Sequence, residues 1–146
     1  MDTVDCIEAA IAVVIFDEEG RVLLQKRADT EQWGIPSGHI EIGETIENAV
    51  IREVKEETNL DVRVTKLIGV YSDPESQVFS YPEGKTVHFI TTSFLAEVIG
   101  GQLKINDDES ADLKFFPQNH LPSNMINLHP CWLDDALSVK ERAYIR

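Results

Sequence analysis

The sequence contains few cysteines and no long apolar segment, and each shortage excludes a class of protein. Its two cysteines, Cys6 and Cys131, lie far apart in the sequence without metal-ligand spacing. We expect both to be reduced thiols, and a single disulfide between them is the alternative. No apolar run is long enough to span a bilayer. The first residues lack the positive charge of a secretory signal. These features predict a cytoplasmic protein that does not associate with membranes.

Basic residues are also scarce, because 13 Lys and Arg stand against 26 Asp and Glu, which gives a net charge of −13. Proteins that bind nucleic acid polymers normally carry a basic patch, so this balance argues against such a partner. An acidic protein repels an anionic substrate unless cations lie between them, although part of the charge serves solubility. The four histidines form no His/Cys cluster, so no zinc site is expected.

The length and the apolar pattern predict one domain spanning residues 1–146. Apolar or β-branched runs predict strands at 9–16, 21–27, 61–70, 86–99 and 113–116. We expect the first two strands to form a hairpin through the turn at 17–20. Helices are predicted at 46–58 and 132–144. Strands around two main helices predict an α/β or α+β fold with a mixed sheet between helices.

The predicted helix at 46–58 brings three carboxylates together. Positions three and four apart share a helix face, so Glu53, Glu56 and Glu57 lie close to one another. The apolar stripe of this helix, formed by Ile46, Ala49, Val50 and Val54, runs into Glu53 and Glu57 with Glu56 on its flank. The inward face therefore begins apolar and ends acidic.

Two interpretations of these carboxylates follow from the helix alone. They are either solvent-facing charges, some paired with Lys55 or Arg52, or ligands of a hard divalent cation such as Mg²⁺, which prefers oxygen ligands. Helix geometry does not separate the two.

The spacing around the helix resembles the signature of the Nudix hydrolase family. The pattern G-x5-E-x7-R-E-(aliphatic)-x-E-E-x-G-(aliphatic) is matched by Gly38, Glu44, Arg52, Glu53, Val54, Glu56, Glu57 and Leu60. The resemblance covers residues 33–60 strongly, and its many fixed positions make it specific. It implies an α/β/α sandwich and a divalent-metal-dependent hydrolase that cleaves the pyrophosphate bond of a nucleoside diphosphate linked to another group.

One position departs from the family pattern, because Asn59 stands where the family usually has Gly. That residue closes the helix in a left-handed conformation, and Asn is the next most tolerant residue there. We interpret Asn59 as a substitute cap that leaves catalysis intact.

The resemblance assigns the metal site to four residues. Glu53, Glu56 and Glu57 are the implied carboxylate ligands of Mg²⁺ or, alternatively, Mn²⁺, and Gly38 is a candidate ligand through its backbone carbonyl. One of the three glutamates could also act as the base toward the attacking water, and which one stays open. Members of the family often form homodimers, which leaves a homodimer open here.

Three further residues receive roles from the resemblance. Arg52 is expected to pair with a glutamate and orient it, and Glu44 to brace the junction between loop and helix, with metal binding as the lesser alternative. Glu109, within the acidic run 107–109, is a candidate catalytic residue, because many members use a glutamate from a downstream loop. The competing interpretation of this run is a solvated turn.

Residues that recognise a base are poorly specified by the sequence. Stacking candidates are Trp33, Tyr71, Phe79, Tyr81, His88 and Trp132, and core packing competes for each of them. Arg27 is a candidate phosphate contact, and an exposed ion pair is its alternative.

Two other functions compete with the enzyme. The first is a Nudix-like module that binds a nucleotide or ADP-ribose without cleaving it, and the second is a structural interaction domain. Arg52 and all three helix glutamates are present, which favours the enzyme. The substrate itself, among nucleoside triphosphates, ADP-ribose, dinucleoside polyphosphates and sugar nucleotides, stays open.

Overall fold

The computed structural model describes residues 3–146, which form nine strands and three helices. The strands are β1 (Cys6–Ile15), β2 (Val22–Arg27), β3 (Trp33–Gly34), β4 (Ser37–His39), β5 (Leu60–Tyr71), β6 (Val78–Ser80), β7 (Thr86–Gly101), β8 (Ser110–Phe116) and β9 (Tyr144–Ile145). The helices are α1 (Ile46–Thr58), α2 (Pro74–Gln77) and α3 (Trp132–Leu137).

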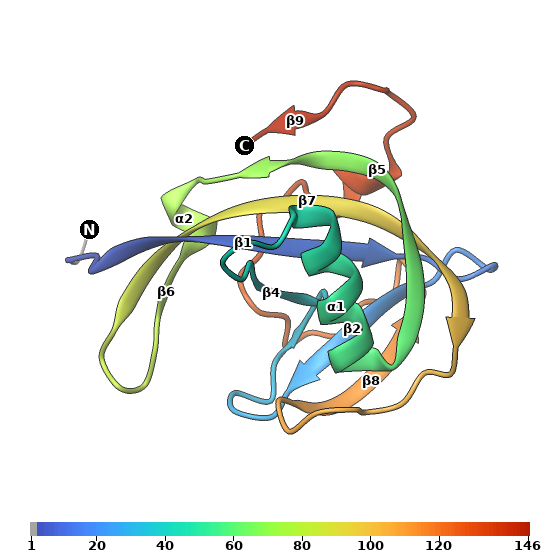
Figure 1. Cartoon of the computed structure of the whole chain (residues 1–146), viewed down its shortest axis with the longest axis horizontal. Coiled ribbons are helices and arrows are strands. Elements are labelled where there is room, and N and C mark those ends of the chain that lie inside the picture. The colour runs from blue at the N-terminus through green and yellow to red at the C-terminus, as the bar shows by residue number, and fades with distance from the viewer. Residues whose placement is uncertain (1–2) are drawn as a thin grey trace.

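The strands form two sheets. The larger is mixed, with the order β4-β1-β7-β5-β9 and with β6 paired to β7. In it β1 runs parallel to β7 and β5 parallel to β9, while the other pairs are antiparallel. The smaller sheet is antiparallel, with the order β3-β2-β8. Helix α1 lies across one face of the mixed sheet, with β2 and β8 beside it (Figure 1).

Strand β1 is buried on both faces from Ala10 to Ile15, and this part divides the core. Its odd-numbered residues, such as Ile11 and Val13, pack with Val50 and Val54 of α1, while even-numbered Val14 packs on the other side with Ala136 of α3. Alternate strand residues point to opposite faces, so a continuous apolar run is what a sheet between two helices requires. The predicted α/β/α layering with a mixed sheet is therefore confirmed.

The predicted hairpin between the first two strands is wrong. Both edges of β1 are occupied, by β4 on one side and β7 on the other, so β2 pairs with β3 and β8 in the second sheet. A single bridge between Phe16 and Val22 is what joins the two strands at the turn.

Helix α1 has the predicted bounds, and Thr45 caps its N-terminus. The Thr45 hydroxyl accepts a hydrogen bond from the Asn48 amide at 3.1 Å, which satisfies a free N–H of the first turn. Ala49, Val50 and Val54 are fully buried. Ile46 departs from the predicted stripe, because it is the first residue of the helix and is exposed.

Asn59 closes α1 in the left-handed conformation, with φ = 64°, as predicted. We expect Asn59→Gly to leave stability nearly unchanged, because relief of backbone strain offsets the lost bond from the Asn59 amide to the Gln102 carbonyl. Asn59→Val should destabilise the fold by about 1–2 kcal/mol, since a β-branched residue is strained at positive φ. Thermal melts of both variants measure this. Equal melting temperatures for Val and Gly would contradict the cap assignment.

The predicted C-terminal helix at 132–144 is mostly wrong. Helix α3 ends at Leu137, and the chain then turns back so that β9 pairs with β5. The side chains that suggested a longer helix do not form a buried stripe, because Leu137 and Val139 are exposed. None of the helices within residues 3–146 has the length and apolarity that crossing a membrane requires.

Candidate active site

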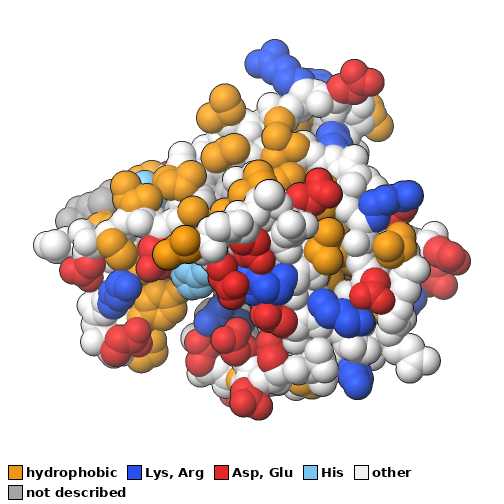
Figure 2. Space-filling model, viewed as in Figure 1, with side chains coloured by type: hydrophobic (Ala, Val, Ile, Leu, Met, Phe, Trp, Pro, Cys, Tyr) orange, Lys and Arg blue, Asp and Glu red, His pale blue; other side chains and the backbone are white. Residues whose placement is uncertain are grey.

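The acidic end of α1 points toward the inside of the molecule. Glu57 is 3% exposed and Glu53 is mostly buried, as the apolar stripe of the helix predicts. Glu56 lies on the flank and its side chain is 54% exposed. Two of the three predicted carboxylates are therefore buried together, and the third lies at the surface beside them. Figure 2 shows acidic side chains gathered around a hollow on this face of the molecule.

Arg52 links the loop before α1 to these carboxylates. Its guanidinium donates to Glu44 at 2.7 and 2.9 Å, to Glu53 at 3.0 Å, to Glu56 at 3.2 Å and to the His39 carbonyl at 3.0 Å. The hydrogen bonds from Arg52 hold the pKa of Glu44 below its usual value. The predicted pairing of Arg52 with a glutamate, and the position of Glu44 at the loop–helix junction, are both present.

Glu57 is the most unusual group in the site. Its Oε2 atom is buried and has no hydrogen-bond partner in the structure. Burial raises the pKa of Glu57 well above its usual value, and the nearby charges of Glu53, Asp107 and Glu109 raise it further. An unpartnered buried carboxylate among other carboxylates is costly unless a cation joins them. The site therefore fits a positively charged ligand.

Gly38 lies directly against the same cluster. A Cβ atom at this position would lie 2.2–2.6 Å from the carboxylate atoms of Glu53, far inside any real contact distance. A side chain at position 38 would therefore displace the Glu53 carboxylate, whereas glycine lets the loop backbone approach it closely. Gly38 lies in β4, where it pairs with Ile11 of β1.

The carboxylates of the cluster are not arranged as a preformed metal site. Among residues 3–146, no three Asp, Glu, His or Cys side chains are already arranged to enclose an ion. Glu56 in particular is bonded to Arg52 at the surface. The metal set of Gly38, Glu53, Glu56 and Glu57 therefore stays a prediction, supported by the unpartnered oxygen of Glu57 and the chemistry of the donors.

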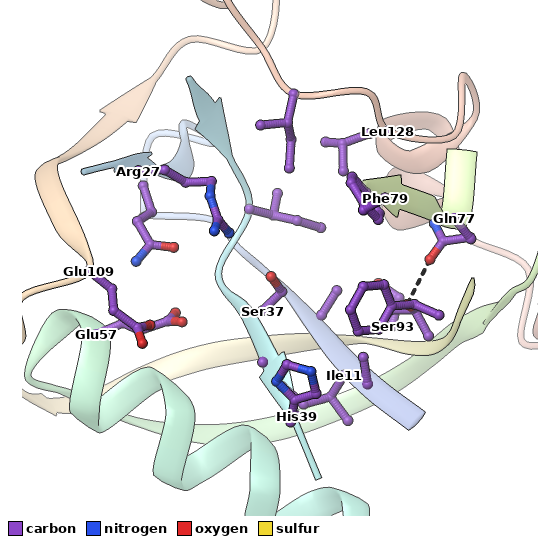
Figure 3. A pocket seen from close by; sticks show the side chains of 18 of the residues that line it. Ile11, Arg27, Ser37, His39, Glu57, Gln77, Phe79, Ser93, Glu109 and Leu128 are labelled. Carbon is purple, nitrogen blue, oxygen red and sulfur yellow. Dashed lines mark hydrogen bonds between the residues drawn. The ribbon is translucent and has the colours of Figure 1, made fainter. Parts of the chain in front are cut away.

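The downstream loop brings Glu109 to this cluster. Its carbonyl accepts a hydrogen bond from the Ala28 amide at 2.8 Å, which ties the loop to the end of β2. Figure 3 shows the Glu109 side chain beside that of Glu57. The structure thus places the predicted residue next to the helix carboxylates, and its catalytic role stays a prediction.

A cavity of about 640 Å³ begins at the acidic cluster and continues to an aromatic end. Arg27 projects into it between these two ends (Figure 3). The Arg27 guanidinium donates to both oxygens of Asp29, at 3.0 and 2.8 Å, which fixes its direction. The cavity thus has one acidic end, a central cation and an apolar far end.

Four of the six stacking candidates line the cavity: Tyr71, Phe79, Tyr81 and Trp132. Trp33 instead packs in the core against Phe116, with ring centroids 4.9 Å apart. His88 is bonded through Nε2 to the Ser72 carbonyl at 2.7 Å and does not reach the cavity.

Sequence reasoning missed several lining residues, including Gln77 and Phe89. The Gln77 side chain accepts a hydrogen bond from the Thr91 hydroxyl at 2.7 Å and is buried. These residues come from α2 and the first half of β7, and the pairing of β6 with β7 brings them together. A local sequence pattern carries no signal for that pairing.

Comparisons with known proteins agree with this architecture. The model of the NUDIX domain family matches residues 7–136. An ADP-ribose pyrophosphatase of Methanocaldococcus jannaschii is 42% identical over 120 residues, which cover 80% of this chain and 66% of the relative. An NAD-capped RNA hydrolase of Vibrio atlanticus is 33% identical over 75% of this chain and 38% of its own length.

A solved structure gives the same fold. The crystal structure of an ADP-ribose pyrophosphatase from Streptococcus suis superposes with a TM-score of 0.74 at 23% identity, over 95% of this chain and 97% of that one. The chain spans just under two thirds of the Methanocaldococcus relative, so the family rather than a substrate is what the comparisons establish. With the family model matching most of its length, the chain belongs to the Nudix domain family.

Proposed function

We propose that this chain hydrolyses the pyrophosphate bond of a nucleoside diphosphate linked to another group, with a divalent metal ion. The observation that carries the proposal is the buried, unpartnered Oε2 of Glu57 at one end of a cavity whose other end is aromatic. An anionic diphosphate fits beside Arg27 and a metal ion bound at the acidic end, and a base fits the aromatic end. The pyrophosphatase and hydrolase names of the relatives belong to the same reaction class.

Gly38, Glu53, Glu56 and Glu57 are the residues that we propose to hold the ion, with Mg²⁺ first and Mn²⁺ as the alternative. All of them offer oxygen, which is the donor that both ions prefer. A bound divalent ion would neutralise the charge that develops on the phosphoryl oxygens. Because net repulsion in this acidic protein opposes substrate binding, the ion also lets the cavity accept an anion.

Other side chains of the site supply the base, orient Glu53 and contact the phosphate. The base toward the attacking water comes from this acidic cluster, either from one of the helix glutamates or from Glu109, which lies beside Glu57. Arg52 fixes the orientation of Glu53 through its bond of 3.0 Å. Arg27, already oriented by Asp29, contacts a phosphate oxygen.

A substrate panel tests the proposal. Purified protein with Mg²⁺ is incubated with ADP-ribose, nucleoside triphosphates, a dinucleoside polyphosphate and a sugar nucleotide, and the products are separated by chromatography. We expect release of a nucleoside monophosphate or of pyrophosphate from at least one compound. The control is a simple phosphomonoester, which should stay intact because it has no pyrophosphate bond. Binding of these compounds without any product would instead identify a non-cleaving nucleotide or ADP-ribose module.

A further inference from the structure

One wall at the aromatic end of the cavity is built from three side chains. Tyr71 ends β5, His129 lies in the loop that follows β8, and Trp132 opens α3. The rings of Tyr71 and His129 meet edge to face, with centroids 5.6 Å apart. Aromatic faces of this kind stack on nucleotide bases. We refer to Tyr71, His129 and Trp132 as the aromatic wall.

Helix α3, which carries Trp132 of this wall, depends on tertiary contacts for its position. Helix α3 has six residues, and its N-cap residue, Cys131, makes no side-chain capping bond. Isolated helices this short are unstable, so tertiary contacts must fix α3. One such contact involves Asp135, one turn after Trp132, and the Asp135 side chain is almost fully buried.

Arg146 neutralises that buried carboxylate. Its Nε donates to Asp135 Oδ2 at 3.0 Å and its Nη2 to Oδ1 at 2.7 Å, while the Tyr71 hydroxyl donates to Oδ2 at 2.7 Å. Burial acts to raise the pKa of Asp135, but these bonds outweigh it and hold that pKa below its usual value. One carboxylate therefore joins the end of β5, helix α3 and the residue after β9.

The backbone fixes Arg146 relative to Tyr71. The Arg146 amide donates to the Val70 carbonyl at 2.9 Å, and the Ser72 amide donates to the Arg146 carbonyl at 2.7 Å. Gly69 permits this approach, because a Cβ there would lie 2.5 Å from the Tyr144 carbonyl oxygen. These backbone hydrogen bonds thus fix the position of Arg146 next to the aromatic wall.

We propose that Arg146, acting through Asp135, is a positioning residue that holds the aromatic wall in place for the base of the nucleotide. The proposal rests on the proposed function for the identity of that ligand. Arg146 lies beyond residues 7–136, the part of the chain that the family model matches. Leu128, which precedes His129 of the aromatic wall, lies across the cavity from Glu57 (Figure 3). We therefore expect the wall to act on binding of the base and to leave the phosphorus chemistry unchanged.

The test compares Arg146→Met with Arg63→Met in the full chain. Arg63 lies on the same strand as Tyr71, and its ion pair with Glu97 is exposed and away from the cavity. For the best substrate of the panel, we expect Arg146→Met to raise KM about tenfold with kcat within about twofold, because ground-state binding is lost. Arg63→Met should change neither. Arg146→Lys should restore part of the affinity, since the ammonium still pairs with Asp135 without the two-pronged geometry.

A second measurement separates this proposal from the proposed function. Binding of AMP, GMP, CMP and UMP is followed in the presence of Mg²⁺ by tryptophan fluorescence, which needs no turnover because these compounds have no pyrophosphate bond. Weaker binding of the preferred monophosphate by Arg146→Met, with Arg63→Met unchanged, supports the wall even if no panel compound is cleaved. Should Arg146→Met fail to fold, Tyr71→Phe removes one bond to Asp135 and should show the same weaker binding.

Three results would overturn the proposal. They are equal KM values for Arg146→Met and Arg63→Met, a fall in kcat with unchanged KM for Arg146→Met, and no binding of any of the four monophosphates by the wild-type chain.

Discussion

Glu57→Gln is expected to lower kcat by on the order of 10²-fold or more, with the fold intact. The reason is that Glu57 carries the buried, unpartnered oxygen at the acidic end of the cavity. Gln has nearly the same shape but no charge, so the variant weakens ion binding without opening a hole. Stability of the metal-free variant should be equal or higher, because a buried charge among other carboxylates is removed. Steady-state kinetics at saturating Mg²⁺, together with thermal melts, measure both effects.

Two further variants on the same helix provide a second test and a control. Glu56→Gln should also lower kcat, although Glu56 is more exposed and bonded to Arg52. Glu47→Gln is the matched control, since Glu47 is exposed in the first turn, far from the cluster, and should behave as wild type. Near-normal rates for both Glu56→Gln and Glu57→Gln would show that the metal assignment is wrong.

Removal of divalent ions is expected to abolish activity, and Mg²⁺ or Mn²⁺ should restore it. The same ions should raise the melting temperature, because a ligand that binds the native state stabilises it and the carboxylates repel one another without it. Melting curves in EDTA, and then over a series of Mg²⁺ concentrations, follow the second effect.

The control for this experiment is NaCl at matched ionic strength, because salt alone screens repulsion in a protein of net charge −13. Glu57→Gln should show a smaller Mg²⁺-dependent shift than wild type. Full turnover in excess chelator would point to a different chemistry.

The sequence predicted helix α1 well because its signals are local. The threonine cap, the apolar stripe and Asn59 all act within a few residues, and the bounds Ile46–Thr58 match the prediction. The hairpin failed because β4 and β7, which are distant in sequence, take both edges of β1. The predicted C-terminal helix ends early because the chain turns back after Leu137, so that Tyr144 and Ile145 pair with β5 and Arg146 bonds to Asp135.

The candidate site divides in the same way. The inward position of Glu53 and Glu57 could be predicted from helix spacing, whereas Gly38 and the metal role of the glutamates could be proposed from the resemblance. Glu109 could be proposed from the resemblance alone, and the structure places it beside Glu57. Gln77 and the bond from Arg146 to Asp135 could not be proposed, since they depend on strand pairings that bring distant segments together.

The most direct test of the central claim follows the phosphorus atoms themselves. The best substrate of the panel is incubated with wild-type chain and Mg²⁺ and observed by ³¹P NMR. The account predicts that the diphosphate resonances disappear as those of the two products grow, and that Glu57→Gln and chelator each slow this conversion by about 100-fold or more. Conversion at the wild-type rate by Glu57→Gln, or by the wild-type chain in excess chelator, would contradict the account.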